Sequence, residues 1–187
     1  MVRERDSLER RPTTRDELLH ILSMVDQNTL FGATMHASFC LAFAGFLWIG
    51  EFAWNAGDLD EEFARCYVIR RSMVLHDDYI EFTLPSSKPD LFRKGITLTI
   101  AVADDEACPL RSLRHLFNTF PTLPSLPLFN RGRPFTRQLV NNVLRNTIKS
   151  WGFVGHYLSS PLRYCAGART SCLLLCPQNG YENRTLC

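Results

Sequence analysis

Residues 30–50 read LFGATMHASFCLAFAGFLWIG, and this stretch contains no Asp, Glu, Lys or Arg. Its length approaches the roughly 20 apolar residues that a membrane span needs. Small or polar residues interrupt it at five positions: Gly32, Thr34, His36, Ser38 and Gly45. A helix that is apolar on all sides is typical of the centre of a globular core. We therefore predict a buried core helix over about residues 32–48 in preference to a membrane span.

The residues before this stretch predict a first helix. Thr14 and Glu17 have the spacing of a capping box, and apolar residues follow at helical intervals up to Val25. A helix over about residues 14–25 is therefore expected. Residues 1–12 are polar and mixed in charge, and they are interpreted as a tail.

The residues after the apolar stretch change from strand-like to helical patterns. Four short runs rich in β-branched and aromatic residues predict strands, namely 67–69, 73–75, 79–84 and 96–100. Residues 76–78 predict a turn, and 85–90 begin the connection of a longer hairpin. Amphipathic patterns then predict a helix over about 110–120 and another over about 136–150, with Thr136 as its cap.

Taken together, the patterns predict one domain of the α+β class, mainly α with a small three-stranded antiparallel sheet. The 187 residues, 45% of them apolar and 21% charged, fit a single globular domain. We place the domain at residues 13–163. Residues 164–187 have no clean periodicity and are interpreted as a degenerate tail in which the final helices are missing.

Cysteine usage and the N-terminus indicate an intracellular protein. The seven cysteines include no C-x-x-C pair and no neighbouring pair of histidines at ligand spacing. Buried free thiols are therefore expected, with neither a metal site nor a cofactor. The polar N-terminus does not have the pattern of a secretory signal, so a reducing intracellular compartment is expected, the nucleus if the source is eukaryotic.

Charge is divided unevenly along the chain. Residues 1–106 hold 11 Lys/Arg against 18 Asp/Glu, whereas residues 107–187 hold 10 Lys/Arg against one Asp/Glu. The second half therefore carries a net +9, with Glu182 as its one acid. Such an asymmetry indicates an anionic partner, most often a phosphate backbone. A solvated basic face without a partner is the alternative.

Several segments resemble the catalytic domain of tyrosine recombinases, especially the integrases of eukaryotic mobile elements. The similar segments are FCLAFAGFLWIGEF (39–52), LPSSKPD (84–90), CPL (108–110), PLF (127–129) and GHYLSSPLR (155–163). The resemblance covers about residues 12–163. It implies a fold that binds double-stranded DNA for recombination and integration, and it leaves open assembly into a homo-oligomer on DNA.

The resemblance also implies a chemistry. In that family a Tyr attacks a DNA phosphate, two Arg side chains bind its oxygens, a hairpin Lys protonates the leaving oxygen, and a His assists. By position, Lys88 matches the hairpin Lys and Arg163 matches the second Arg, so both are remnants of a catalytic site. The first Arg would stand at Trp48, two residues before Gly50, and the family's His would stand at Ser160.

The match to the family's chemistry is incomplete at the nucleophile. Tyr164 and Tyr181 lie too close to Arg163 to match the family's nucleophilic Tyr, and its preceding box is not found before Cys187. We therefore expect a truncated, degenerate relative without strand cleavage. A frameshift or a mis-spliced end in a decaying element would account for the tail, and the genomic sequence beyond it would test that hypothesis.

Basic residues of the acid-poor half are the expected DNA contacts. They are Arg111, Arg114, Arg131, Arg133, Arg137, Arg145 and Lys149. A second class of function stays open, in which the chain is a protein-interaction module that keeps the fold without DNA binding. Salt-dependent binding to DNA distinguishes the two classes.

Overall fold

A computed structural model describes residues 13–47, 49–53, 68–84, 95–121, 135–150 and 184–186, without the side chains of 148, 149 and 184–186. The helices are α1 (Arg15–Ser23), α2 (Leu30–Ala44), α3 (Ile49–Phe52), α5 (Pro109–Thr119) and α6 (Arg137–Ser150), with a 3₁₀ turn η1 (Arg70–Ser72). The strands are β1 (Met73–Leu75), β2 (Tyr79–Leu84), β3 (Ile96–Ala101) and β4 (Arg184–Leu186). The fold is therefore α+β, as predicted.

Local capping explains where the helices begin. The Thr14 hydroxyl accepts from the Glu17 N–H at 3.2 Å, and the Glu17 carboxylate accepts from the Thr14 N–H at 2.8 Å. Thr29 accepts from the Gly32 N–H at the start of α2, and Thr136 accepts from the Leu139 N–H at the start of α6. The capping box and the Thr136 cap predicted from the sequence are confirmed.

Helix α2 forms the centre of the core. Its residues from Gly32 to Ala42 are all buried, and Phe39 is fully enclosed. The helix ends at Ala44, earlier than the predicted residue 48, because the chain turns at Gly45 and Phe46 adopts a left-handed φ of 50°. The Leu47 N–H then donates to the Ala42 carbonyl at 2.9 Å, which closes the helix end. No helix among the described residues is long and apolar enough to cross a membrane.

The sheet has the order β1-β2-β3-β4. Strands β1, β2 and β3 are antiparallel neighbours, with Phe82 opposite both Met73 and Leu98. This part confirms the predicted three-stranded antiparallel sheet. Strand β4 adds a short parallel neighbour to β3, and it lies within residues 164–187, which the sequence analysis interprets as a degenerate tail. A three-residue strand is too short to produce a periodic pattern, and its backbone pairs with the free edge of β3.

One predicted strand, 67–69, lies partly outside the described residues. Of the two residues that the structure describes, Val68 has no strand conformation and Ile69 forms an isolated bridge, and the chain turns through η1 directly after Ile69. The turn bonds the Ser72 N–H to the Ile69 carbonyl at 3.0 Å. The apolar character of Val68 and Ile69 reflects burial in the core, which both residues share without belonging to a strand of the sheet.

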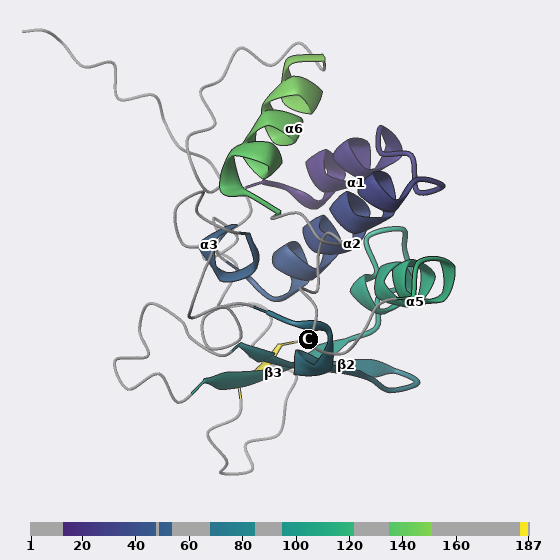
Figure 1. The fold of residues 1–187 in the computed structure, drawn as a ribbon, viewed down its shortest axis with the longest axis vertical. Helices are drawn as coiled ribbons and strands as arrows, with labels where there is room; N and C mark the ends of the chain where they lie inside the picture. Colours follow the sequence, from purple (N-terminus) through teal and green to yellow (C-terminus); the bar gives the residue numbers. More distant parts are fainter. Residues whose placement is uncertain are drawn as a thin grey trace, which may run out of the picture.

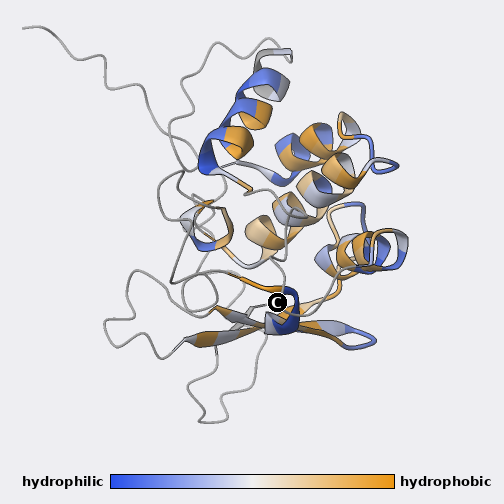
Figure 2. Ribbon diagram, in the orientation of Figure 1, coloured by the Kyte–Doolittle hydropathy of each residue, from blue (hydrophilic) through white to orange (hydrophobic). Residues whose placement is uncertain are grey.

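The helices and the sheet form two layers around one core (Figure 1). Helix α2 runs through the middle of the helices, with α1 and α6 on one side and α5 on the other, and the sheet lies beyond α2 and α5. Ile80, Phe82 and Ile100 of the sheet are buried in the same core as α2. Hydrophilic residues line the outer sides of α5 and α6 (Figure 2). The arginines of these two helices are therefore presented away from the core.

Candidate nucleic-acid interface

The structure describes part of the set of residues expected to contact DNA. The side chains of Arg111 and Arg114 project from α5, and those of Arg137 and Arg145 project from α6. Lys149 belongs to α6, but its side chain is not described. The remaining expected site residues lie outside the described residues: Lys88, Arg131, Arg133 and Arg163, together with Trp48 and Ser160. Strands β2 and β3 pair as a hairpin, and Lys88 belongs by sequence to the segment that connects them.

Arg114 is engaged by the protein. Its Nη2 donates to the His76 carbonyl at 2.7 Å and lies 3.5 Å from the Asp77 carboxylate. The side chain thus ties α5 to the β1–β2 turn, the turn that the sequence predicted at residues 76–78. An exposed ion pair of this kind contributes about 1 kcal/mol or less. Arg114 is accordingly less free to contact a phosphate than its position on α5 suggests.

Arg70 packs against Phe117 of α5. Its guanidinium lies 3.7 Å from the centre of the Phe117 ring, and Nη1 donates to the Met73 carbonyl at 3.1 Å. Burial lowers the pKa of the guanidinium from its usual value. Because β1 lies at the edge of the sheet, the Met73 carbonyl is not used in strand pairing and can accept this hydrogen bond from Arg70. No sequence pattern predicted this contact, because Arg70 and Phe117 are far apart in the chain.

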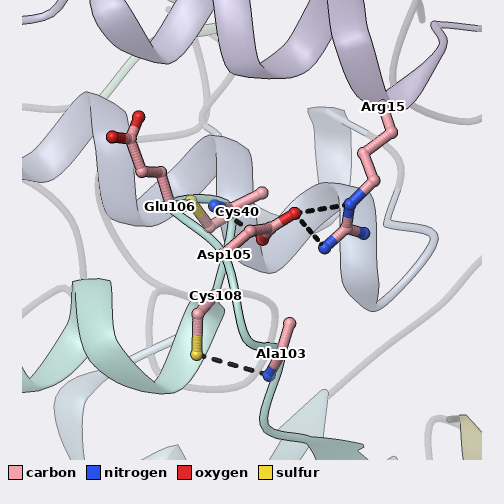
Figure 3. A network of polar contacts seen from close by, with 7 residues as sticks. Arg15, Cys40, Ala103, Asp105, Glu106 and Cys108 are labelled. Carbon is pink, nitrogen blue, oxygen red and sulfur yellow. Dashed lines mark hydrogen bonds and ion pairs between the residues drawn. The ribbon is translucent and has the colours of Figure 1, made fainter.

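A third arginine, Arg15, joins α1 to the loop before α5 (Figure 3). Its Nε donates to the Asp105 carboxylate at 2.6 Å, and Nη2 lies 2.5 Å from the same oxygen. The other carboxylate oxygen of Asp105 accepts from the Ala107 N–H at 3.0 Å. Asp105 therefore stabilises the loop that leads into α5, and Arg15 links that loop to α1.

The remaining arginines whose side chains are described have no partner among the described residues. Arg71, Arg111, Arg137 and Arg145 are exposed, and no described residue forms a hydrogen bond or an ion pair with their side chains. Three of these four belong to α5 and α6, the helices of the half that is nearly free of acids. Their guanidinium donors are available to an anionic partner.

The free arginines of α5 and α6 lie on two separate surfaces. Arg111 is on α5, which packs against α2, whereas Arg137 and Arg145 are on α6, which packs against α1 and α3. The two helices lie on opposite sides of α2 (Figure 1). A partner that contacts both surfaces at once must therefore reach around the helical layer, and α6, with two free arginines, is the stronger candidate for the primary contact.

A buried polar cluster positions α5 against α2. His36 Nδ1 lies 3.1 Å from the Ser112 hydroxyl, which donates to the Cys108 carbonyl at 2.9 Å and lies 3.3 Å from the Cys40 sulfur. The Cys108 sulfur accepts from the backbone N–H of Ala103 at 3.5 Å (Figure 3). It also accepts from the backbone N–H of Arg111 at 3.5 Å, and so caps the start of α5. The cluster aligns the helix that carries Arg111.

This cluster has the residue types of a nucleophilic site but not its electrostatics. Burial and, to a smaller extent, the nearby His115 lower the pKa of His36 to about 4. Burial raises the pKa of the Cys40 thiol to about 12. At neutral pH the histidine is thus uncharged and Cys40 is not a thiolate, which is the species that attacks. Cys40 and Cys108 are buried free thiols, as the sequence predicted.

Within the described part of the chain, no group of three or more His, Cys, Asp or Glu residues could hold a metal ion. No protein-family model and no curated protein matches the chain. The chemistry of the site therefore has to be inferred from the residues themselves.

Proposed function

We propose that the chain is a DNA-binding protein of the recombination and integration class that does not cleave DNA. The observation that carries the proposal is the exposure of Arg111, Arg137 and Arg145 without protein partners, on two helices of a half that holds one acid against ten basic residues. Phosphate contacts by such residues release counterions and give binding with little sequence preference.

The order of the elements supports the class of the proposal. An apolar helix, a short helix bearing Gly50 and Glu51, an antiparallel hairpin bearing Lys88 and two basic helices follow one another along the chain. This order is similar to that of a tyrosine recombinase catalytic domain. On the same resemblance, Lys88 and Arg163 are the residues left from a phosphate-cleaving site.

We expect the protein to bind duplex DNA with a steep dependence on salt. If about 5 phosphates are contacted, log K against log [salt] should have a slope near −4 to −5. The double variant Arg137→Gln/Arg145→Gln should reduce that slope by about 2, because each phosphate contact contributes about 1. Fluorescence anisotropy of a labelled duplex at several salt concentrations measures both quantities.

Two variants serve as controls for this measurement. Gln138→Ala and Asn142→Ala alter exposed, uncharged side chains of α6 and should leave the slope unchanged. Arg114→Gln should also leave it nearly unchanged, because its guanidinium is engaged by the β1–β2 turn. Undetectable binding at low salt, or binding that is independent of salt, would contradict the proposal and favour a protein-interaction module.

We expect no covalent joint between the 187-residue chain and DNA. Loss of a phosphate-binding guanidinium at Trp48 typically lowers a rate by about 10²–10³, and loss of a proton-transfer partner at Ser160 lowers it by roughly 10²–10⁴. Tyr164 and Tyr181 follow Arg163 by 1 and 18 residues, so neither matches the family's nucleophile. Trp48→Arg should therefore not restore cleavage.

A nicked suicide substrate tests this expectation. A protein–DNA band that survives denaturant, and that disappears in Tyr181→Phe, would identify a nucleophile in the tail and overturn the inactive assignment. A catalytic relative from the same class is the positive control for the substrate.

A further inference from the structure

Helices α3 and α6 meet where Gly50 faces Arg137. A Cβ atom built on Gly50 would lie 2.7 Å from Cζ and 3.1 Å from Nε of Arg137, and closer still to Nη2. All three distances are shorter than ordinary van der Waals contact, so the guanidinium occupies the space that a side chain would fill. The absence of a side chain at Gly50 is thus what admits Arg137 to this position.

A pair of aromatic residues fixes the same junction from inside the core. The rings of Phe52 and Phe135 are 6.3 Å apart and tilted by 41°, and both side chains are almost fully buried. Phe52 lies two residues after Gly50, and Phe135 lies two residues before Arg137. The ring contact holds the start of α6 against α3 and determines where the Arg137 side chain begins.

Among the described residues, none is seen to form a hydrogen bond or an ion pair with the Arg137 guanidinium. Guanidinium donors match the two oxygens of a phosphate in a planar fork. Arg137 is also the first residue of α6, and the positive end of a helix favours a full negative charge over the neutral edge of a base.

We propose that Arg137, lying against Gly50, contacts one backbone phosphate of DNA, and that Gly50 is its positioning residue. This inference rests on the DNA-binding function proposed above and assigns its ligand at the junction of α3 and α6. The space that Gly50 leaves open admits the guanidinium beside α3, and a methyl group at this position would displace it from there. Gly50 thereby acts on DNA affinity through Arg137 without touching DNA itself.

A double-mutant cycle tests whether Gly50 affects DNA binding through Arg137. Duplex binding is measured by anisotropy for the wild-type chain, Gly50→Ala, Arg137→Gln and the combined variant. A contact worth about one unit of salt slope corresponds to roughly a fivefold change in affinity at 0.15 M salt. We expect each single variant to bind roughly fivefold more weakly and the combined variant to bind no more weakly than Arg137→Gln.

Three further variants and measurements make the result specific. Arg137→Lys keeps the charge but loses the planar pair of guanidinium donors. It should therefore bind DNA more weakly than the wild type and retain most of the slope of log K against log [salt]. Gln138→Ala, an exposed neighbour on α6, should bind like the wild type. Thermal unfolding of Gly50→Ala should remain cooperative, because the end of the Arg137 side chain can move away from the added methyl group.

Each remaining outcome decides the matter. Wild-type affinity in Gly50→Ala together with weak binding in Arg137→Gln would overturn the positioning role and leave Arg137 as an ordinary contact. Wild-type affinity in both would remove the junction from the interface while the proposed function stands on Arg111 and Arg145. A chain that binds no DNA at low salt would overturn both the inference and the proposed function.

Discussion

Lowering the pH from about 6.5 to about 4 should reduce the free energy of unfolding by about 2–3 kcal/mol through His36 alone. The ordinary pKa of a histidine is near 6.5, and burial between α2 and α5 lowers that of His36 to about 4. Between these values the unfolded chain binds a proton that the folded protein excludes. The stability is complete above pH 6.5, declines as the pH falls and has lost this contribution by about pH 4, at roughly 1.4 kcal/mol per unit of pKa difference.

Urea unfolding at several pH values measures this loss, with His36→Asn as the matched variant. Asn can still bond to the Ser112 hydroxyl through its side-chain amide, but it does not titrate. The variant should be less stable at pH 7, because it leaves a small cavity, and its free energy of unfolding should depend less steeply on pH. An equally steep pH dependence in the wild type and in His36→Asn would show that carboxylates, and not His36, cause the loss.

Gly32→Ala should destabilise the fold by about 2 kcal/mol or more, although alanine is the better helix former. Propensity alone favours Ala over Gly in a helix by about 1 kcal/mol. A Cβ at Gly32, however, would meet the backbone carbonyl of Asp26, whose carbon it would approach to 2.6 Å. The Asp26 carbonyl accepts from the Thr29 hydroxyl at 3.1 Å, so moving it opens the cap of α2. Overpacking of this kind costs about 1–3 kcal/mol, sometimes more, and loss of a cap adds to it.

Gly50→Ala is the control for Gly32→Ala. A Cβ at Gly50 is also closer than ordinary contact, but it meets the flexible end of the Arg137 side chain and not backbone. Its stability should therefore stay within about 1 kcal/mol of the wild type, since surface side chains relax at little cost. Equal losses in the two variants, measured by denaturant unfolding, would mean that the approach of the Asp26 backbone is not what destabilises Gly32→Ala.

Short-range patterns explain what could be predicted of the site. The basic faces of α5 and α6 follow from helical spacing, and the Thr136 cap sets the start of α6. The pattern could not separate Arg111 from Arg114, which lie three residues apart on the same helix. That distinction depends on the β1–β2 turn, which contacts Arg114 from 37 residues away in the chain.

The sequence by itself determined the elements that local contacts stabilise. The capping box of Thr14 and Glu17, the apolar helix α2 and the alternating strand β2 all arise from interactions between residues a few positions apart. Tertiary structure alone decided which residues meet across the chain: the turn of Phe46 that ends α2, the parallel pairing of β4, the Arg70–Phe117 contact and the seat of Arg137 on Gly50. The physical reason is that these contacts depend on where distant segments pack, and a burial or a close approach of that kind leaves no periodic signal in either segment.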